Sequence, residues 1–276
     1  SVKAENKNNE RYYYNQLNAD AKGIYDAMYK MYEKGIFKTG EQGYDLVANG
    51  HITSEQLAAY NEKTILSVFG AARDAFYADY PDIFYVDFSN LSINVTEKTI
   101  AAPSVSENDT VVYGASLGTG RTDTCYVQGF GDQAQVEKAV GEHEKKIDAI
   151  VQGARSKSQS VREQVAYVNN AIIDNTVYKL DTNCSPGNSG HVRTSYGALV
   201  KGESLCEGYA RAVKVVLDEL GIRSVLVQGS YRAPDGSDNL HMWNYVQVDG
   251  KWYGLDATAN DGMKGGADRE KYLLAE

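Results

Sequence analysis

Three residues in the C-terminal third of the chain have the side chains that activated thiol chemistry needs: Cys206, His241 and Asp256. A cysteine thiolate is a strong nucleophile, and an imidazole within hydrogen-bond reach can take up and return its proton. A carboxylate can hold that imidazole in one orientation and stabilise its charged form. Whether these three side chains meet depends on the elements that carry them.

The cysteine lies in the stretch from 202 to 210, which reads Gly-Glu-Ser-Leu-Cys-Glu-Gly-Tyr-Ala. Ser204 and Glu207 have the spacing of a capping box, so Ser204 is the predicted N-cap of a helix that ends at Gly221. Cys206 then lies in the first turn, where unpaired N–H groups and the helix dipole favour a thiolate or an oxyanion. The alternative is that Cys206 is a small apolar residue packed under the helix start.

The histidine and the aspartate flank a short turn. The residue types from 241 to 248 and from 251 to 256 are typical of strands, and an Asp-Gly pair separates the two runs. Asp-Gly is a strong signal for a two-residue hairpin turn. This turn predicts an antiparallel pair in which Val248 lies opposite Lys251.

The same register, continued away from the turn, places His241 opposite Thr258 and Asp256 opposite Trp243. His241 and Asp256 are then diagonal neighbours on one face, roughly 7–8 Å apart and close enough to hydrogen-bond. A slip of one residue would put them on opposite faces. Considered singly, each residue has a plainer interpretation: His241 as a polar side chain with its hydrogen bonds made, and Asp256 as the cap of a turn.

The segment from about 195 to 260 resembles the transglutaminase-like superfamily of bacterial proteins. Its members carry Gly-x-x-x-Cys-x-Gly-Tyr-Ala at a helix start, then a His heading a strand and an Asp in the next strand. The matching residues are Gly202, Cys206, Gly208, Tyr209, Ala210, His241, Trp243, Asn244, Gly250, Trp252, Tyr253, Asp256 and Thr258.

This resemblance implies that Cys206 is the nucleophile, His241 the general base and acid, and Asp256 the orienting carboxylate. Such an enzyme forms a thioester from a peptide or glutamine amide and needs no cofactor. An amine acceptor gives cross-linking, and water gives deamidation or proteolysis. Glu207 stands where animal transglutaminases and papain-like proteases have Trp, which leaves transfer and hydrolysis both open.

The resemblance does not identify the side chain that would stabilise the oxyanion. Tyr196, just upstream of the nucleophile helix, and Trp243 are secondary candidates for oxyanion or substrate contacts. A buried tyrosine with its hydroxyl paired is the plainer interpretation of Tyr196.

The hydrophobic spacing predicts an α+β fold. The resemblance implies that its core is transglutaminase-like (papain-like), with the nucleophile at a helix N-terminus on an antiparallel sheet. Residues 1–130 are expected to form an N-terminal region of helices with a few strands, and residues 131–276 the catalytic core, packed as one unit. Helices are expected over 17–34, from Ser54 as N-cap to Phe76, after Asp132 and over 160–175. Short strands are expected over 83–86, 91–95, 110–115 and 124–128.

Composition narrows the class of partner. The chain has 276 residues with a formal net charge of -9, and no run of basic residues suits it to nucleic acid. No apolar stretch approaches the roughly 20 residues that span a bilayer. The polar start at Ser1 is typical of a mature terminus. The expected partner is a protein or peptide, with a cell-wall link left open, and the expected location is extracellular or on the cell surface.

Several other residues have competing interpretations. Cys125 and Cys184 either form a disulfide or stay free, since sequence alone cannot bring them together. The cysteines and histidines lack the close spacing of a zinc site, so no metal is expected. His143, within a charged run, is predicted to be solvated. The tyrosines at 12 to 14 either pack against the first helix or bind a carbohydrate or protein partner.

A second hypothesis comes from a different class of protein. The chain could be a cell-surface binding or structural module that keeps the fold without turnover, because no catalytic motif occurs in the long N-terminal half. The intact set of Cys206, His241 and Asp256 favours the enzyme.

Overall fold

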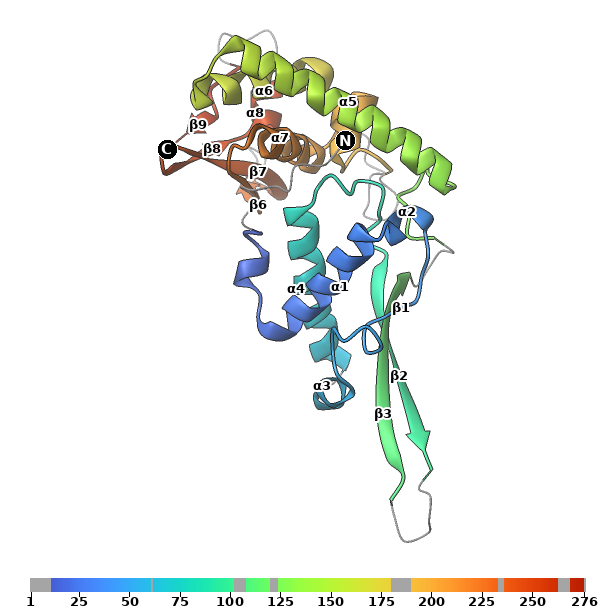
Figure 1. The fold of residues 1–276 in the computed structure, drawn as a ribbon. Coiled ribbons are helices and arrows are strands. Elements are labelled where there is room, and N and C mark those ends of the chain that lie inside the picture. Colours follow the sequence, from blue (N-terminus) through green and yellow to red (C-terminus); the bar gives the residue numbers. More distant parts are fainter. Residues whose placement is uncertain are drawn as a thin grey trace.

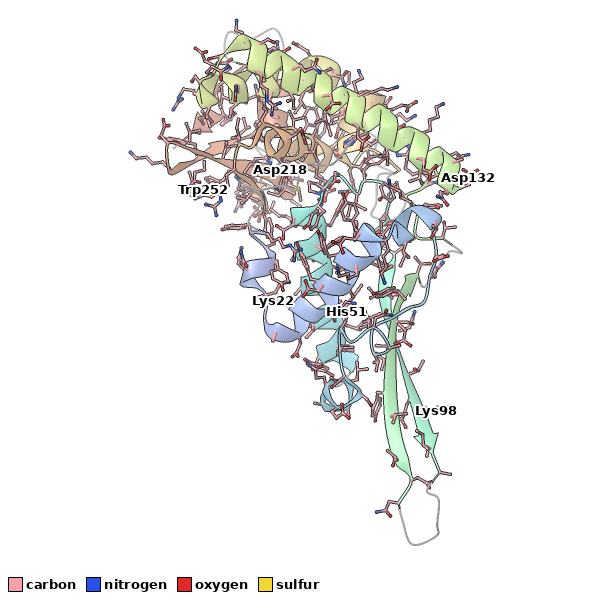
Figure 2. The ribbon with its side chains drawn as sticks, viewed as in Figure 1. Lys22, His51, Lys98, Asp132, Asp218 and Trp252 are labelled. Carbon is pink, nitrogen blue, oxygen red and sulfur yellow. The ribbon has the colours of Figure 1, made fainter. Side chains whose placement is uncertain are left out.

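Helices and antiparallel strands alternate along the chain, which gives the predicted α+β class. The computed structural model describes residues 11–60, 62–101, 108–119, 124–179, 190–232, 236–262 and 269–275. Figure 1 shows a helical part with a projecting β-hairpin, and above it a part in which helices cover a sheet. Figure 2 shows Lys98 on the hairpin and Asp218 within the packed C-terminal part.

The N-terminal part is built from helices that cross beside a three-stranded sheet of order β1-β3-β2. Its core is rich in aromatic side chains, such as Tyr25, Phe37 and Phe76, which are all fully buried. Its elements are η1 (Tyr14–Gln16), α1 (Ala19–Glu33), α2 (Ile36–Thr39), β1 (Tyr44–Asp45), α3 (Ser54–Ala59), α4 (Glu62–Asp79), β2 (Leu91–Ile100) and β3 (Thr110–Thr119).

Two expectations for this part were wrong in detail. The helix predicted from Ser54 is two helices, because the backbone is extended at Tyr60, and its N-cap is Thr53, which forms a capping box with Gln56. The runs 83–86 and 124–128 form only an isolated bridge between Val86 and Tyr126.

The C-terminal part places helices against a four-stranded antiparallel sheet of order β6-β7-β8-β9. The helices expected after Asp132 and over 160–175 are confirmed. Its elements are α5 (Gln133–Lys157), α6 (Val161–Asn175), β4 (Val177–Tyr178), η2 (Gly197–Lys201), β5 (Glu203–Ser204), α7 (Cys206–Leu220), β6 (Ser224–Arg232), β7 (Asp238–Val248), β8 (Lys251–Leu255), α8 (Ala257–Asp261) and β9 (Leu273–Ala275).

Helix α7 is the central element of this part. Every residue from Gly208 to Leu217 is buried, including the cations Arg211 and Lys214. The Lys214 ammonium is 1% exposed and donates to both carboxylate oxygens of Asp218 at 2.9 Å, one helical turn later. Burial raises the pKa of Asp218 to about 6. A helix enclosed on all sides has a fixed direction, so the position of its first residue is fixed as well.

The N-terminal segment is tied to both parts by a buried carboxylate and a tyrosine hydroxyl. Asp79, at the end of α4, accepts bonds from the backbone N–H groups of Tyr13 and Tyr14 and from the Tyr25 hydroxyl. The Tyr13 hydroxyl donates to the Leu226 carbonyl of β6. Tyr13 and Tyr14 therefore pack against the N-terminal core, which agrees with the packing interpretation of these tyrosines. The division of the chain at residue 130 stays a prediction.

His143 is not solvated, and that prediction was wrong. Its side chain is buried, its Nε2 lies 3.0 Å from the Ser195 hydroxyl, and its ring packs on Phe84. The charged neighbours lie on the outer face of α5, whereas His143 shares the inner face with Val136 and Ile147.

Cys125 is a buried free thiol whose pKa is raised to about 11 by burial. Cys184 lies outside the described residues.

We expect Lys214→Ala to lower the free energy of unfolding by about 3–5 kcal/mol, because it leaves the Asp218 carboxylate buried without its cation. The loss should be smaller at pH 5 than at pH 8, since a protonated Asp218 needs no partner. Urea denaturation followed by circular dichroism measures both quantities. Lys138→Ala is the control: it breaks an exposed pair of the same spacing with Glu142 and should change little. Equal losses in both variants would contradict the prediction.

Candidate active site

Cys206 is the first residue of α7, and its N-cap is Leu205. The predicted N-cap, Ser204, lies instead in β5, where its hydroxyl contacts the carbonyl oxygens of Val192 and Leu205. The predicted capping box is therefore wrong, because the serine hydroxyl bonds to a distant loop rather than to the helix. Leu205 provides no side-chain cap. The first turn thus keeps N–H groups that can face an anion.

The loop from 192 to 194 packs directly against this first turn and holds it. A Cβ atom on Gly208 would lie 2.1 Å from the Ser204 hydroxyl oxygen and under 3 Å from the carbonyl oxygens of Val192 and Thr194. Only glycine fits this approach, because two of the three neighbours are backbone atoms. Arg193 adds a 2.5 Å ion pair to Glu207. The Gly of the Cys-x-Gly motif is therefore a packing requirement of the helix start.

The hairpin turn that carries the histidine forms as predicted. Val248 lies opposite Lys251, and Asp249 and Gly250 both have positive φ angles, of 50° and 80°. These angles are those of the hairpin turn that Asp-Gly favours. The register near the turn is confirmed, so the face of β7 that carries His241 is the predicted one.

The continuation of that register was wrong. Strand β8 ends at Leu255, and Asp256 is the N-cap of α8 rather than a strand residue opposite Trp243. His241 lies opposite Gly229 of β6. The two side chains nevertheless meet, with 2.7 Å between His241 Nε2 and Asp256 Oδ2.

Asp256 uses its two oxygens for different partners. Oδ2 contacts the imidazole, and Oδ1 accepts the backbone N–H of Ala259 at 3.0 Å, which caps α8. The imidazole is also stacked on Trp243, with 5.9 Å between ring centroids and 22° between planes. The His241 ring is therefore held at one nitrogen and on one face.

The His241 imidazole is a strong base in this setting. The hydrogen bond that the imidazole donates to Asp256 is the main cause that raises the pKa of His241 to about 9, followed by the hydrogen bond to the Cys206 side chain, while burial opposes both. Since Asp256 occupies Nε2, Nδ1 is the nitrogen available to the thiol. The structure thus brings the three predicted residues together, with His241 in the middle and protonated at neutral pH.

The two secondary candidates lie in different places. Trp243 packs on His241, within the site. Tyr196 is 3% exposed, stacks on Phe84 and donates its hydroxyl to Glu142 at 3.0 Å. The Tyr196 hydroxyl is engaged in the core, as the plainer interpretation held, and nothing in its contacts supports an oxyanion role.

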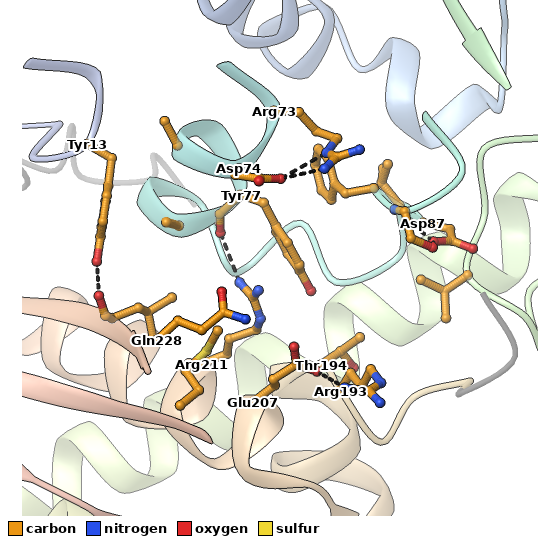
Figure 3. Close-up of a pocket in the computed structure, with 18 of the residues that line it drawn as sticks. Tyr13, Arg73, Asp74, Tyr77, Asp87, Arg193, Thr194, Glu207, Arg211 and Gln228 are labelled. Atoms are coloured by element: carbon orange, nitrogen blue, oxygen red, sulfur yellow. Dashed lines mark hydrogen bonds and ion pairs between the residues drawn. The ribbon is translucent and has the colours of Figure 1, made fainter. Parts of the chain in front are cut away.

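A pocket of about 550 Å³ lies between α4 and the start of α7. Glu207, which directly follows Cys206, lines it, and Met242 contributes from the face of β7 opposite to His241. Figure 3 shows Arg211 and Gln228 pointing into this space, below Tyr77 of α4. Sequence reasoning missed this pocket because its walls come from segments far apart in the chain. The one available signal was a cation at 211 among the apolar residues of a helix.

Two searches of the described residues gave negative results. No group of three or more histidine, cysteine or acidic side chains is placed to hold a metal ion in the described ranges. No helix in this part of the chain is long and apolar enough to cross a membrane.

Residues 147–257 match the family model of the transglutaminase-like superfamily. This range contains Cys206, His241 and Asp256, and the match supports the resemblance to that superfamily that the motif predicted. A search of curated proteins gave no match.

Two solved structures are similar at 14% identity. One is a protein called a TGase, with a TM-score of 0.37, and the similarity covers 62% of this chain and 45% of that one. The other is the periplasmic domain of TgpA from Pseudomonas aeruginosa, with a TM-score of 0.30, covering 62% of this chain and 66% of that one. The chain thus spans less than two thirds of either structure, and nothing about activity follows from these likenesses.

We expect Asp256→Asn to move the titration midpoint of His241 from about 9 back towards the ordinary 6.5, because the variant removes the carboxylate that stabilises the imidazolium. Asparagine keeps an oxygen that can cap α8, so the fold should persist. The pH dependence of the histidine ring proton signals in NMR spectra measures the midpoint. His51, whose pKa is lowered by burial, should titrate unchanged in both proteins. A His241 midpoint near 6.5 in the unaltered protein would contradict this assignment.

Proposed function

We propose that this chain is a cysteine enzyme that acts on peptide or glutamine amides through a thioester on Cys206. The observation that carries the proposal is the position of His241 between Asp256 and the Cys206 thiol, with its pKa raised to about 9. An imidazolium that persists at neutral pH stabilises a thiolate beside it. The match of residues 147–257 to the superfamily model supports the same chemistry.

In the proposed mechanism, the Cys206 thiolate attacks the amide carbonyl carbon, and the carbonyl oxygen becomes an oxyanion. First-turn N–H groups of α7, to which the N-cap Leu205 offers no side-chain acceptor, are suited to stabilise this oxyanion. His241 donates its proton to the leaving nitrogen, and the C–N bond breaks to give the thioester. His241 then removes a proton from water or an amine, which attacks the thioester and releases Cys206. Asp256 orients the imidazole throughout.

The acceptor decides between hydrolysis and transfer, and both outcomes use the same thioester. Amine incorporation into a glutamine peptide would identify a transglutaminase, and release of a free carboxylate would identify a protease or deamidase.

The proposed location, extracellular or on the cell surface, is independent of the reaction type. Labelling of intact cells with an impermeant reagent would test it.

We expect Cys206→Ala to lower turnover of a susceptible amide by more than about a thousandfold, because no other group forms the thioester. His241→Ala should act similarly. Short glutamine peptides, incubated with and without a primary amine, are the substrates, and mass spectrometry of intact protein detects the acyl-enzyme. Cys125→Ala is the matched control and should keep full activity, since Cys125 is buried away from these residues.

Alkylation by iodoacetamide gives a test that needs no substrate. Cys206 should react at least about tenfold faster than Cys125 at pH 7, because the pKa of the buried Cys125 thiol is raised to about 11. His241→Ala should slow the alkylation of Cys206 and leave that of Cys125 unchanged, because the variant lacks the imidazolium that stabilises the Cys206 thiolate. Slow alkylation of Cys206, together with tight binding to a wall polymer and no turnover, would favour the non-catalytic module instead.

A further inference from the structure

Arg211 carries a buried charge that forms no ion pair with a carboxylate among the described residues. The residue is 8% exposed. Its guanidinium lies 3.6 Å from the centroid of the Tyr77 ring, and Nη1 donates to the Tyr77 carbonyl oxygen at 3.1 Å. Among the described residues, no group accepts a hydrogen bond from the buried Nε. An arginine has five N–H donors, and a carboxylate is the group that matches their geometry.

The acidic residues around the same pocket already have partners. Glu207 is paired with Arg193 at 2.5 Å, although it stands one helical turn from Arg211 on α7. Asp74 is paired with Arg73. Asp87 accepts hydrogen bonds from Ser89 and Asn90. Arg211 is thus a cation in the pocket wall that is left for a ligand.

The pocket adjoins the candidate active site at the start of α7, because Glu207, which lines it, directly follows Cys206. Arg211 lies five residues after Cys206, which is roughly 7.5 Å along the helix axis. An extended peptide advances about 3.3 Å per residue, so this distance corresponds to two or three residues of a substrate.

We propose that Arg211 binds a carboxylate of the substrate peptide, two or three residues from the amide that Cys206 attacks. The proposal rests on the proposed function and adds a substrate class to it: peptides with an acidic residue near the reacting amide. Arg211 is then a specificity-determining residue. The alternative is an arginine that only joins α7 to α4 through Tyr77.

The test measures binding without chemistry, in the Cys206→Ala protein. The probes are acetylated, C-terminally amidated peptides with a central glutamine and a glutamate one, two or three residues to either side. Each is compared by calorimetry with the same peptide carrying glutamine in place of that glutamate. Hydrogen bonds between charged groups are stronger than those between neutral groups, so we expect at least one glutamate peptide to bind about tenfold or more tightly than its neutral twin.

In the Cys206→Ala protein that also carries Arg211→Met, the two peptides of the pair should bind equally. Because Arg211 is buried, a second substitution keeps the test valid if this variant fails to fold. Gln228 lies on β6 with an exposed side chain in the same pocket. Gln228→Glu should abolish the preference, since it adds a competing carboxylate, whereas the uncharged Gln228→Met should keep it.

A preference that survives Arg211→Met or Gln228→Glu, or the lack of any preference above twofold at all positions, would overturn the proposal. These outcomes are independent of turnover. Binding selectivity can therefore be present in a protein without activity, and an active protein can lack it, so the failure of one proposal is distinguishable from the failure of the other.

Discussion

The burial of helix α7 on all sides is the constraint on which the rest of the structure depends. A buried helix cannot rotate or slide without breaking its packing, so its first residue, Cys206, is held in one place. The same burial encloses two cations, Lys214 and Arg211, among the apolar residues from Gly208 to Leu217. Lys214 is neutralised by Asp218 on the next turn, whereas Arg211 faces a pocket.

The pocket exists because the two parts of the chain meet beside this helix. Asp79 gathers the N–H groups of Tyr13 and Tyr14, and the Tyr13 hydroxyl reaches the Leu226 carbonyl of β6. A small apolar cluster that includes Ala210 and Met242 packs with Tyr13 at the same junction. The N-terminal half, which carries no catalytic motif of its own, therefore builds one wall of the pocket at the start of α7.

Local sequence signals predicted the elements of the candidate site, and tertiary contacts decided the details. Asp249 and Gly250 determine the hairpin turn because both residue types tolerate the positive φ angles that it requires. The turn also sets the register of the β7–β8 pair next to it. Asp256 was placed in a strand because nothing in the sequence shows that the chain turns into α8 after Leu255. Ser204 was placed as a cap because its distant acceptor, Val192, has no sequence signature. The Arg211 pocket was missed for the same reason: its partner, Tyr77, lies on another helix.

Gly208 has a consequence for how such sequences are classified. The glycine is required by the close approach of the 192–194 loop and takes no part in the proposed proton transfers. A relative that had lost the thiol, the imidazole or the carboxylate would still need glycine there to fold. The Gly-Tyr-Ala portion of the motif therefore identifies the architecture, and only the cysteine, histidine and aspartate bear on whether a given member can react.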